Sequence, residues 1–371
     1  MPIGSSFAPL SSAPRLVPVI TRSFSAALTT KSAKSAPSKD HHVHTYGPQA
    51  FPLGFAVASG HGGVKKKSGA LDLGILASTS KRPCSAAVCS TRNVFQAAPV
   101  IVTNEILQRS GGFARGFVVN SGNANAVTGK KGLEDAWAMS NTVSSLLPPL
   151  STSSTNLQLG TLVMSTGVIG QPLPIQSITA KLSSLTQNLS SSPKAWLDLA
   201  QSFMTTDTFP KLRTRSFAMG DRLVRMVGID KGAGMIAPNM GPPRTPHATL
   251  LGIIATDAAV APAALQSALT YAVNRSFNNI TVDGDMSTND TILCFANGAA
   301  RKIDDQGRES AGPGMEELNE AADPEAFNKF KEELRHFAEE LAQLVIRDGE
   351  GATKFVTVHV KARLEHPKEW G

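Results

Sequence analysis

The residues best suited to chemistry lie in polar segments rich in Gly, Asn and Thr. These segments cover residues 120–126, 165–170, 204–211, 231–236, 248–252 and 276–290. Gly and Asn readily adopt left-handed backbone conformations, so residues 120–126 are compatible with a simple tight connection. Residues 165–170 end an apolar run, where backbone N–H groups can face an anion or an oxyanion, although a strand-ending turn is the plainer interpretation.

Several well-known sites are absent from these segments. Neither a Gly-rich dinucleotide fingerprint, a P-loop nor a GxSxG elbow occurs. Residues 283–290 resemble a calcium loop, but Thr288 replaces the required turn Gly and Cys294 replaces the bidentate Glu. His41, His42 and His44 form a cluster without a second set of ligands, so we predict no metal. An enzyme built from these segments needs another nucleophile, and the residues alone do not say which threonine it is.

The composition is that of a soluble globular protein, with 41% hydrophobic and 18% charged residues in a chain of 371. No apolar run reaches the roughly 20 residues of a membrane-spanning helix, and we predict no membrane partner. The three cysteines, Cys84, Cys89 and Cys294, have no CxxC spacing. They predict packed or surface thiols in a reducing compartment, without a disulfide framework or a zinc site.

The net charge of +7 is concentrated partly at the start of the chain. Five basic residues precede the first acidic one, Asp40, in a stretch rich in Ser and Ala: Arg15, Arg22, Lys31, Lys34 and Lys39. This composition predicts a mitochondrial transit peptide and linker over residues 1–45, the alternative being a disordered tail. Lys65, Lys66 and Lys67 lack interleaved aromatic residues and are interpreted as a solvated turn, so we predict no nucleic-acid partner.

The elements that position these segments are strands mixed with helices. Short apolar runs at 116–119 and 162–164 predict buried strands, and periodic patterns predict helices at 263–275 and 324–346. Asp323 suits the cap of the last helix and Pro324 its first turn. Six apolar residues of that helix form one stripe for core packing: Phe327, Phe330, Leu334, Phe337, Leu341 and Leu344.

An alternating pattern predicts a further strand at 355–360. Low-complexity inserts lie at 151–154 and 241–246. The mixture of strands and helices indicates an α/β or α+β protein.

In the polar segments and in their order, the chain closely resembles the ornithine acetyltransferase (ArgJ) family, the bifunctional arginine-biosynthesis enzymes of the fungal mitochondrial type. The likeness extends over residues 51–360. It implies an α/β fold in which β-sheets form a sandwich covered by helices, of the self-processing N-terminal-nucleophile type (DmpA/ArgJ-like). It also implies a location in the mitochondrial matrix.

The resemblance implies that the precursor breaks its own backbone between Ala248 and Thr249. The products would be an alpha chain (residues 46–248) and a beta chain (residues 249–371) that remain associated, as an α2β2 heterotetramer. The freed α-amino group of Thr249, with a pKa of about 7.7 to 8.0, would then serve as the base for its own hydroxyl group.

The family's reaction implies that Thr249 takes an acetyl group from N2-acetylornithine and passes it to glutamate in a ping-pong cycle. Acetyl-CoA would be a second acetyl donor and a substrate, with no cofactor. Thr166 and Gly167 correspond to the oxyanion hole, which replaces the turn-only interpretation of their segment. The substrate contacts carried over by the resemblance are Thr205, Lys231, Thr249 and Glu350.

The chain departs from the family pattern in two places. The Pro-rich insert lengthens the approach to Thr249, and after residue 360 the family's Asn- and Trp-containing segment, with its last two substrate contacts, is missing. A C-terminal truncation is therefore expected. The alternatives are an inactive or misfolded truncated product, and a related N-terminal-nucleophile aminopeptidase that transfers the acyl group to water.

Overall fold

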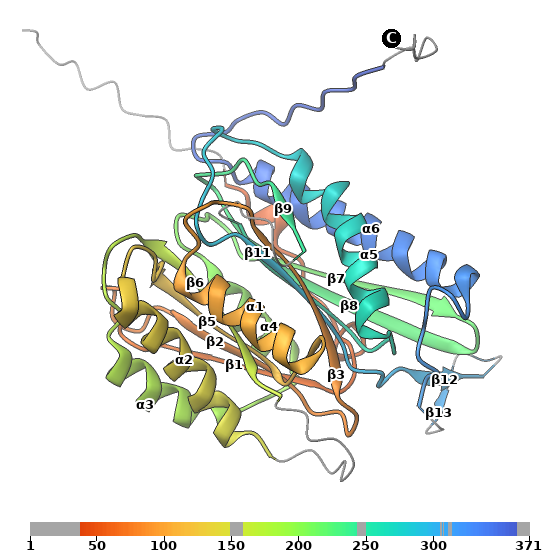
Figure 1. Cartoon of the computed structure of the whole chain (residues 1–371). Coiled ribbons are helices and arrows are strands. Elements are labelled where there is room, and N and C mark those ends of the chain that lie inside the picture. Colours follow the sequence, from red (N-terminus) through yellow and green to blue (C-terminus); the bar gives the residue numbers. More distant parts are fainter. Residues whose placement is uncertain are drawn as a thin grey trace, which may run out of the picture. The chain divides into compact units, whose positions relative to one another are not determined.

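The computed structural model describes residues 38–148, 159–242, 250–304, 306, 308–310 and 314–361. Contacts divide the chain into residues 1–36 and residues 37–371, and all the elements shown in Figure 1 belong to the second unit. Three short 3-10 helices, Asp40–His42, Pro48–Ala50 and Phe277–Asn279, accompany the longer elements.

The smaller sheet has four strands in the order β1-β2-β5-β6. These are β1 (Phe55–Gly60), β2 (Leu73–Ser78), β5 (Gly116–Asn123) and β6 (Thr161–Val168). The β5–β6 pair is parallel and the other two pairs are antiparallel. The two apolar runs predicted as strands lie in β5 and β6, which confirms both predictions.

The larger sheet has nine strands, and its central order is β12-β8-β10-β11-β3. Only the β10–β11 pair is parallel among the pairs of this sheet that the structure describes. Its strands are β3 (Cys84–Thr91), β4 (Phe113–Ala114), β7 (Lys211–Met219), β8 (Arg222–Lys231), β9 (Met240–Gly241), β10 (Leu251–Thr256), β11 (Thr291–Ala296), β12 (Arg301–Ile303) and β13 (Glu309–Ser310).

Helices cover the outer face of each sheet (Figure 1). On the smaller sheet these are α2 (Gly129–Leu146) and α3 (Ile175–Thr186), and on the larger sheet α5 (Pro262–Asn274) and α6 (Pro324–Arg347). The other two, α1 (Ala98–Ser110) and α4 (Pro193–Phe203), contact strands of both sheets. This arrangement confirms the predicted α/β sandwich of sheets covered by helices.

Both faces of the larger sheet are buried, because alternate residues of its strands point to opposite sides. Ile253 belongs to the core shared with the smaller sheet, whereas Ile254 belongs to the core beneath α5 and α6. Between the sheets, the rings of Phe117 and Phe295 stack with their centroids 6.1 Å apart. All three cysteines are buried and free, and burial raises the pKa values of Cys84 and Cys89 to about 12.

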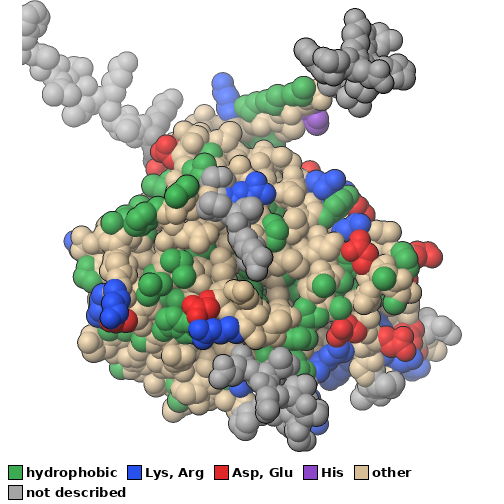
Figure 2. All heavy atoms as spheres, viewed as in Figure 1, with side chains coloured by type: hydrophobic (Ala, Val, Ile, Leu, Met, Phe, Trp, Pro, Cys, Tyr) green, Lys and Arg blue, Asp and Glu red, His purple; other side chains and the backbone are tan. Residues whose placement is uncertain are grey.

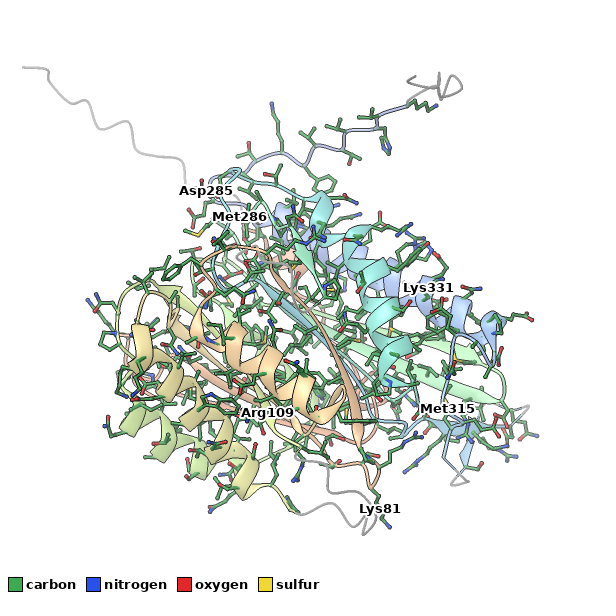
Figure 3. All side chains as sticks on the ribbon, viewed as in Figure 1. Lys81, Arg109, Asp285, Met286, Met315 and Lys331 are labelled. Atoms are coloured by element: carbon green, nitrogen blue, oxygen red, sulfur yellow. The ribbon has the colours of Figure 1, made fainter. Side chains whose placement is uncertain are left out.

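Both predicted helices are confirmed. The carboxylate of Asp323 accepts a hydrogen bond from the Ala326 N–H at the start of α6, and Pro324 is its first residue. All six residues of the predicted apolar stripe are buried. Lys331 of α6 is labelled in Figure 3, and its ammonium group lies 5.0 Å from the ring centroid of Tyr271 of α5.

The predicted strand at 355–360 is wrong. These residues form no regular element, and the side chains of Val356, Val358 and Val360 are more than two-thirds exposed. A strand needs a neighbour for its backbone groups, and no described strand pairs with this segment. Figure 1 shows the segment leading away from the sheets, and Figure 2 shows a row of hydrophobic side chains along it.

Across the described ranges, no helix combines the length and apolar character needed to cross a bilayer.

Candidate active site

Four strand ends meet where the two sheets face each other, and we call this place the polar junction. The carboxyl end of β6 comes from the smaller sheet. The larger sheet contributes the carboxyl end of β8 and the amino ends of β10 and β11. In register, Leu251 pairs with both Lys231 and Thr291, so the ends of β8, β10 and β11 are direct neighbours. The fold thereby collects polar residues that are far apart in the sequence.

Polar contacts link the two sheets at this junction. The Lys231 ammonium group donates to the Thr166 hydroxyl oxygen at 3.3 Å. The Asn289 side-chain amide donates to the carbonyl oxygens of Ser165 at 2.9 Å and Ala124 at 2.6 Å. The contacts to Thr166 and Ser165 fix the carboxyl end of β6 against the larger sheet, and the contact to Ala124 fixes the residue that follows β5.

Thr166 and Gly167 lie at the end of β6, beside Ser121 and Gly122 of β5. Thr166 is buried, while Gly167 is exposed. Gly167 has φ +124°, and a Cβ atom there would lie 2.3 Å from the Gly122 carbonyl carbon and oxygen, so only glycine fits. The pairing with β5 continues to Val168, and the expected strand-ending turn follows at residues 169 and 170, so Thr166 and Gly167 themselves belong to the strand.

Thr205 is attached to the junction through Asp207. The Asp207 carboxylate accepts hydrogen bonds from the Thr205 N–H at 2.9 Å and from the Gly232 N–H at 2.8 Å. It also accepts one from the Lys211 ammonium group at 2.6 Å. Thr205 is half-buried, and Gly232 directly follows Lys231, so this one carboxylate brings two of the predicted substrate contacts together.

Lys231 is buried, and burial lowers its pKa below the ordinary lysine value. The carboxyl groups of Asp207, Asp290 and Glu350 act in the opposite direction, while the Lys211 charge adds to the lowering. No carboxylate of the described residues lies within ion-pair distance of the Lys231 nitrogen, so a bound carboxylate would stabilise the charged form of this side chain.

Glu350 lies just beyond α6, next to the segment that follows Lys231. Its backbone N–H donates to the Ala233 carbonyl oxygen at 2.7 Å. A Cβ atom added to Gly234 would approach the Glu350 carboxylate to 2.7 Å, so the glycine leaves room for this side chain. The Glu350 side chain is exposed, which suits a group that meets a substrate from solution.

The structure adds Asp290, which the sequence offered only as part of a failed calcium loop. Asp290 is buried, and neither carboxyl oxygen has a hydrogen-bond partner among the described residues. Burial raises its pKa well above the ordinary value, against the opposing effect of the Lys231 charge. Asp283 of the same loop accepts hydrogen bonds from the Met235 and Ile236 N–H groups instead.

Ala248 and Thr249, the predicted cleavage site and nucleophile, lie outside the described residues. The next residue, Leu250, is buried, and its carbonyl oxygen accepts a hydrogen bond from the Thr291 N–H at 2.6 Å. Strand β10 begins at Leu251, opposite Lys231. Of the predicted site residues, Thr166, Gly167, Thr205, Lys231 and Glu350 are therefore brought together, and the chain enters the junction at Leu250.

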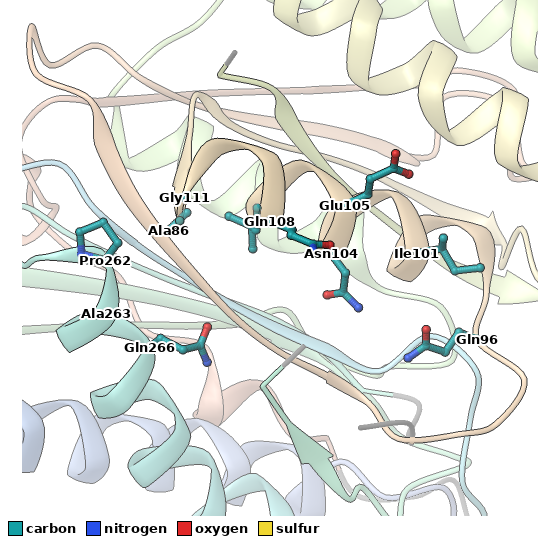
Figure 4. A pocket seen from close by; sticks show the side chains of 12 residues that line it. Ala86, Gln96, Ile101, Asn104, Glu105, Gln108, Gly111, Pro262, Ala263 and Gln266 are labelled. Atoms are coloured by element: carbon teal, nitrogen blue, oxygen red, sulfur yellow. The ribbon is translucent and has the colours of Figure 1, made fainter. Parts of the chain in front are cut away.

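A pocket of about 600 Å³, separate from the polar junction, lies between α1 and the start of α5 (Figure 4). Its polar lining consists mainly of amide side chains, including those of Gln108 and Gln266, and Glu105 is its charged residue. It shares no residue with the predicted site. In the described portion of the chain, no group of three or more His, Cys, Asp or Glu side chains is arranged to hold a metal ion.

Two sheets enclosed by helices, with charged side chains gathered where strand ends meet, define an α/β sandwich protein with a polar site between its sheets. The chain belongs to the ArgJ family, whose family model matches residues 56–367.

Individual proteins of known name are similar over most of the chain. The mitochondrial arginine biosynthesis bifunctional protein ArgJ of Cryptococcus neoformans var. neoformans serotype D (strain B-3501A) is 69% identical over 347 residues, which cover 94% of this chain and 71% of that protein. The protein of the same name from Laccaria bicolor is 55% identical over 338 residues, covering 90% and 69% respectively. The crystal structure of ArgJ from Bacillus halodurans is 34% identical and covers 51% of this chain and 92% of its own, with a TM-score of 0.45.

Proposed function

We propose that this chain is a glutamate N-acetyltransferase of arginine biosynthesis, which moves an acetyl group from N2-acetylornithine to glutamate. A second activity, acetyl transfer from acetyl-CoA to glutamate, belongs to the same proposal, with acetyl-CoA as a substrate and no cofactor. Membership of the ArgJ family supports both activities. The names of the relatives from Cryptococcus and Laccaria support a mitochondrial location, which we assign to the matrix.

The convergence of Thr166, Thr205, Lys231 and Glu350 carries this proposal. These residues come from four separate segments and meet at the polar junction, where Leu250 enters β10. The junction offers a cation in a poorly solvated place, an exposed carboxylate and a glycine that lets two backbones approach closely. An amino-acid substrate needs such a set, because its carboxylate and ammonium groups require opposite charges.

Maturation would occur between Ala248 and Thr249. In the proposed step the Thr249 hydroxyl group attacks the Ala248 carbonyl carbon, the peptide C–N bond breaks, and water opens the resulting ester. The products are an alpha chain of residues 46–248 and a beta chain of residues 249–371, assembled as an α2β2 heterotetramer. The new α-amino group, with a pKa of about 7.7 to 8.0, is a base of suitable strength beside the hydroxyl group.

Acetyl transfer then proceeds in two halves. The Thr249 oxygen bonds to the acetyl carbon of N2-acetylornithine, the amide C–N bond breaks, and ornithine leaves with the hydroxyl proton on its amine. The glutamate amine then attacks the acetyl carbon, the ester C–O bond breaks, and the proton returns to the Thr249 oxygen. This ping-pong cycle forms and breaks one acyl bond in each half.

Each remaining residue has a separate role in the proposal. Thr166 and Gly167 face the negative charge that develops on the acetyl oxygen, and one donor of this kind typically lowers a barrier by about 3 to 4 kcal/mol. Lys231 pairs with a substrate carboxylate and Glu350 with a substrate ammonium group, while Thr205 contacts the substrate beside them.

The test begins with expression of the full chain, a denaturing gel and N-terminal sequencing of the smaller fragment. A new terminus at Thr249 is expected, together with exchange of labelled acetyl groups between N2-acetylornithine and glutamate. Thr249→Ala should leave the chain uncut and inactive, and Thr249→Ser, which keeps a hydroxyl nucleophile, should still be cut.

Other outcomes would refute parts of the proposal. Cutting that persists in Thr249→Ala would exclude this self-cleavage mechanism. Release of acetate without transfer to glutamate would indicate an N-terminal-nucleophile hydrolase. A single uncut band without acetyl exchange would indicate an inactive product.

A further inference from the structure

A basic pocket lies beside the polar junction. Its volume is about 840 Å³, and the charged residues that line it are Lys65, Lys66 and Lys67. Its apolar lining includes Val168 and Met204. The size is within the range of about 300 to 1,000 Å³ typical of small-molecule sites. Three ammonium groups without an acidic lining residue select a ligand that carries several negative charges.

This pocket adjoins the proposed acetyl-transfer site. Thr205, a proposed substrate contact, is also a lining residue, and Val168 lies one residue beyond Gly167 on β6. Burial lowers the pKa of Lys65, Asp207 is among the groups that raise it, and the charge of Lys231 lowers it further. Gly122, which pairs with Gly167 in the sheet, also lines the pocket, so a ligand in this pocket can extend one end toward the transfer site.

The lysine segment is held in a defined conformation by a buried carboxylate. Asp72 is fully buried and accepts hydrogen bonds from the Val64 N–H at 2.8 Å and the Lys65 N–H at 2.9 Å. The Lys65 ammonium group donates to the Leu71 carbonyl oxygen at 2.6 Å. This backbone arrangement places the next two lysines at the pocket in a fixed geometry rather than on a loose connection.

Lys66 and Lys67 are the free charges of the segment. Both are exposed, and in the described part of the chain neither makes an ion pair or a side-chain hydrogen bond. The contrast with the pocket between α1 and α5 is one of charge, because that pocket has Glu105 as its charged residue and no lysine or arginine. An anionic ligand therefore has a reason to choose the pocket beside the junction.

We propose that the pocket at Lys65, Lys66 and Lys67 binds the phosphate groups of acetyl-CoA, with the pantetheine arm directed past Thr205 toward the polar junction. This rests on the proposed function, which makes acetyl-CoA an acetyl donor. The thioester lies at one end of the flexible arm and the phosphates at the other, which matches a basic pocket set beside an acyl-transfer site. N2-acetylornithine has no phosphate and does not need this pocket.

The step that this placement serves is acetylation of the Thr249 hydroxyl group. The acetyl carbon forms a bond to the Thr249 oxygen, the thioester C–S bond breaks, and the hydroxyl proton leaves with the sulfur as the CoA thiol. Transfer to glutamate then follows as in the reaction with N2-acetylornithine. The two donors thus share the nucleophile and differ in the pocket that holds the rest of the molecule.

The experiment compares Lys66→Ala/Lys67→Ala with a matched control, Lys194→Ala/Lys329→Ala, which removes two exposed lysines from α4 and α6. In the test variant, KM for acetyl-CoA should rise roughly tenfold or more, because charge-assisted contacts to phosphate are lost. KM for N2-acetylornithine should stay within about twofold, since its proposed contacts at Thr205, Lys231 and Glu350 are unchanged in this variant. The control should leave both KM values unchanged. Equal changes for both donors, or no change for acetyl-CoA, would overturn the inference.

Calorimetry measures the affinity for CoA without requiring acetyl transfer, so it tests the phosphate site independently of the proposed function. CoA should bind the wild-type chain at least about tenfold more tightly than pantetheine, which lacks the phosphates, and the difference should disappear in Lys66→Ala/Lys67→Ala. If the wild type bound CoA in this way but transferred no acetyl group, the proposed function would fail and the phosphate site would stand. Equal affinity for CoA and pantetheine would refute the phosphate site, whatever the activities.

Discussion

Lys211 and Lys231 are two buried lysines on adjacent strands, and they differ in their partners. The Lys211 ammonium group lies 2.6 Å from carboxylate oxygens of both Asp207 and Asp348. Lys231 has the Thr166 hydroxyl group, at 3.3 Å, as its hydrogen-bond partner. Burial acts to lower both pKa values, but the surrounding carboxylates raise that of Lys211, whereas that of Lys231 stays lowered.

The difference follows from which face of the sheet each side chain occupies. Lys211 pairs in register with Asp230, so its side chain points to the face that Asp230 occupies. Lys231 is the next residue of β8 and points to the other face, toward Thr166 of the smaller sheet. Lys211 therefore connects Asp348 at the end of α6 to Asp207 before β7, and Lys231 is left available to a ligand. We expect the first to act mainly on stability and the second mainly on activity.

Lys211→Ala should have the largest effect. It removes the cation that bridges the buried carboxylates of Asp207 and Asp348, and Asp348 keeps only the more distant Lys39, at 3.6 Å. A buried ion pair that loses one partner costs about 3 to 5 kcal/mol. The free energy of unfolding, measured by urea denaturation, should fall by about that amount. The control is Lys194→Ala, which removes an exposed partner of Asp198 and should change stability by less than about 1 kcal/mol. Equal losses in the two variants would contradict the assigned role of Lys211.

Lys231→Met should change activity far more than stability. The substitution removes a charge that is buried without an ion pair, so the free energy of unfolding should shift by less than about 1.5 kcal/mol in either direction. Loss of a charged contact to the substrate carboxylate, about 1.5 to 3 kcal/mol, should lower kcat/KM roughly ten- to a hundred-fold. Steady-state kinetics with N2-acetylornithine and glutamate measure this. Unchanged kcat/KM in a folded variant would remove Lys231 from the substrate site.

The two lysines should respond to pH in opposite ways. The raised pKa of Lys211 gives a stabilising contribution that is fully present below the unfolded value of about 10.4 and is lost as pH rises through the higher folded pKa. The pKa of Lys231 is lower in the folded state than in the unfolded state. Between these two pKa values the folded state binds fewer protons than the unfolded state, so the contribution of Lys231 to stability rises with pH in that window.

Substrate binding should show the lowered pKa of Lys231 directly. KM for N2-acetylornithine should rise as pH increases through that pKa, at a lower pH than an ordinary lysine would require. Lys231→Arg retains its charge, since arginine has a pKa above about 12, so in this variant the rise should move to higher pH. An identical pH profile in both proteins would show that another group causes the change.

Asp290→Asn should have the smallest effect on stability. Burial raises the pKa of Asp290 well above the ordinary value and so disfavours its charged form, and an amide of similar shape replaces the carboxyl group. We expect a change below about 1 kcal/mol at pH 7, measured by urea denaturation. Asp207→Asn is the contrasting variant. The charges of Lys211 and Lys231 lower the pKa of Asp207 and favour its carboxylate form, so in this variant the free energy of unfolding should fall several times more than in Asp290→Asn.

Much of the fold was predictable from local patterns. The cap at Asp323, the proline after it and the apolar stripe of α6 act within one helix, and all three agree with the structure. The apolar runs in β5 and β6 were also predictable, since each is bounded by turn-forming residues. The strand predicted at 355–360 failed because a strand depends on a partner elsewhere in the chain, which an alternating pattern does not specify.

The candidate site was only partly predictable. The resemblance to the ornithine acetyltransferase family indicated Thr166, Gly167, Thr205, Lys231 and Glu350, and the structure brings these five together at the polar junction. Their roles, and those of Ala248 and Thr249, remain predictions. Asp207 and Asp290 lie within the polar segments, but the sequence did not distinguish them from their neighbours. A carboxylate that bridges two lysines, or one that lacks a partner, is recognised from burial and distance rather than from residue type.

By itself, the sequence determined the periodic helices, the central strands, the glycines of the polar segments and the family to which the chain belongs. Only the tertiary structure decided which lysine is satisfied and which is not. Lys211 and Lys231 are both lysines at strand ends, but a one-residue step along a strand reverses the face to which a side chain points. Lys211 faces α6 and contacts the carboxylates of Asp207 and Asp348, whereas Lys231 faces the smaller sheet and contacts the Thr166 hydroxyl group. The charge environment depends on segments far away in the chain, which local patterns do not contain.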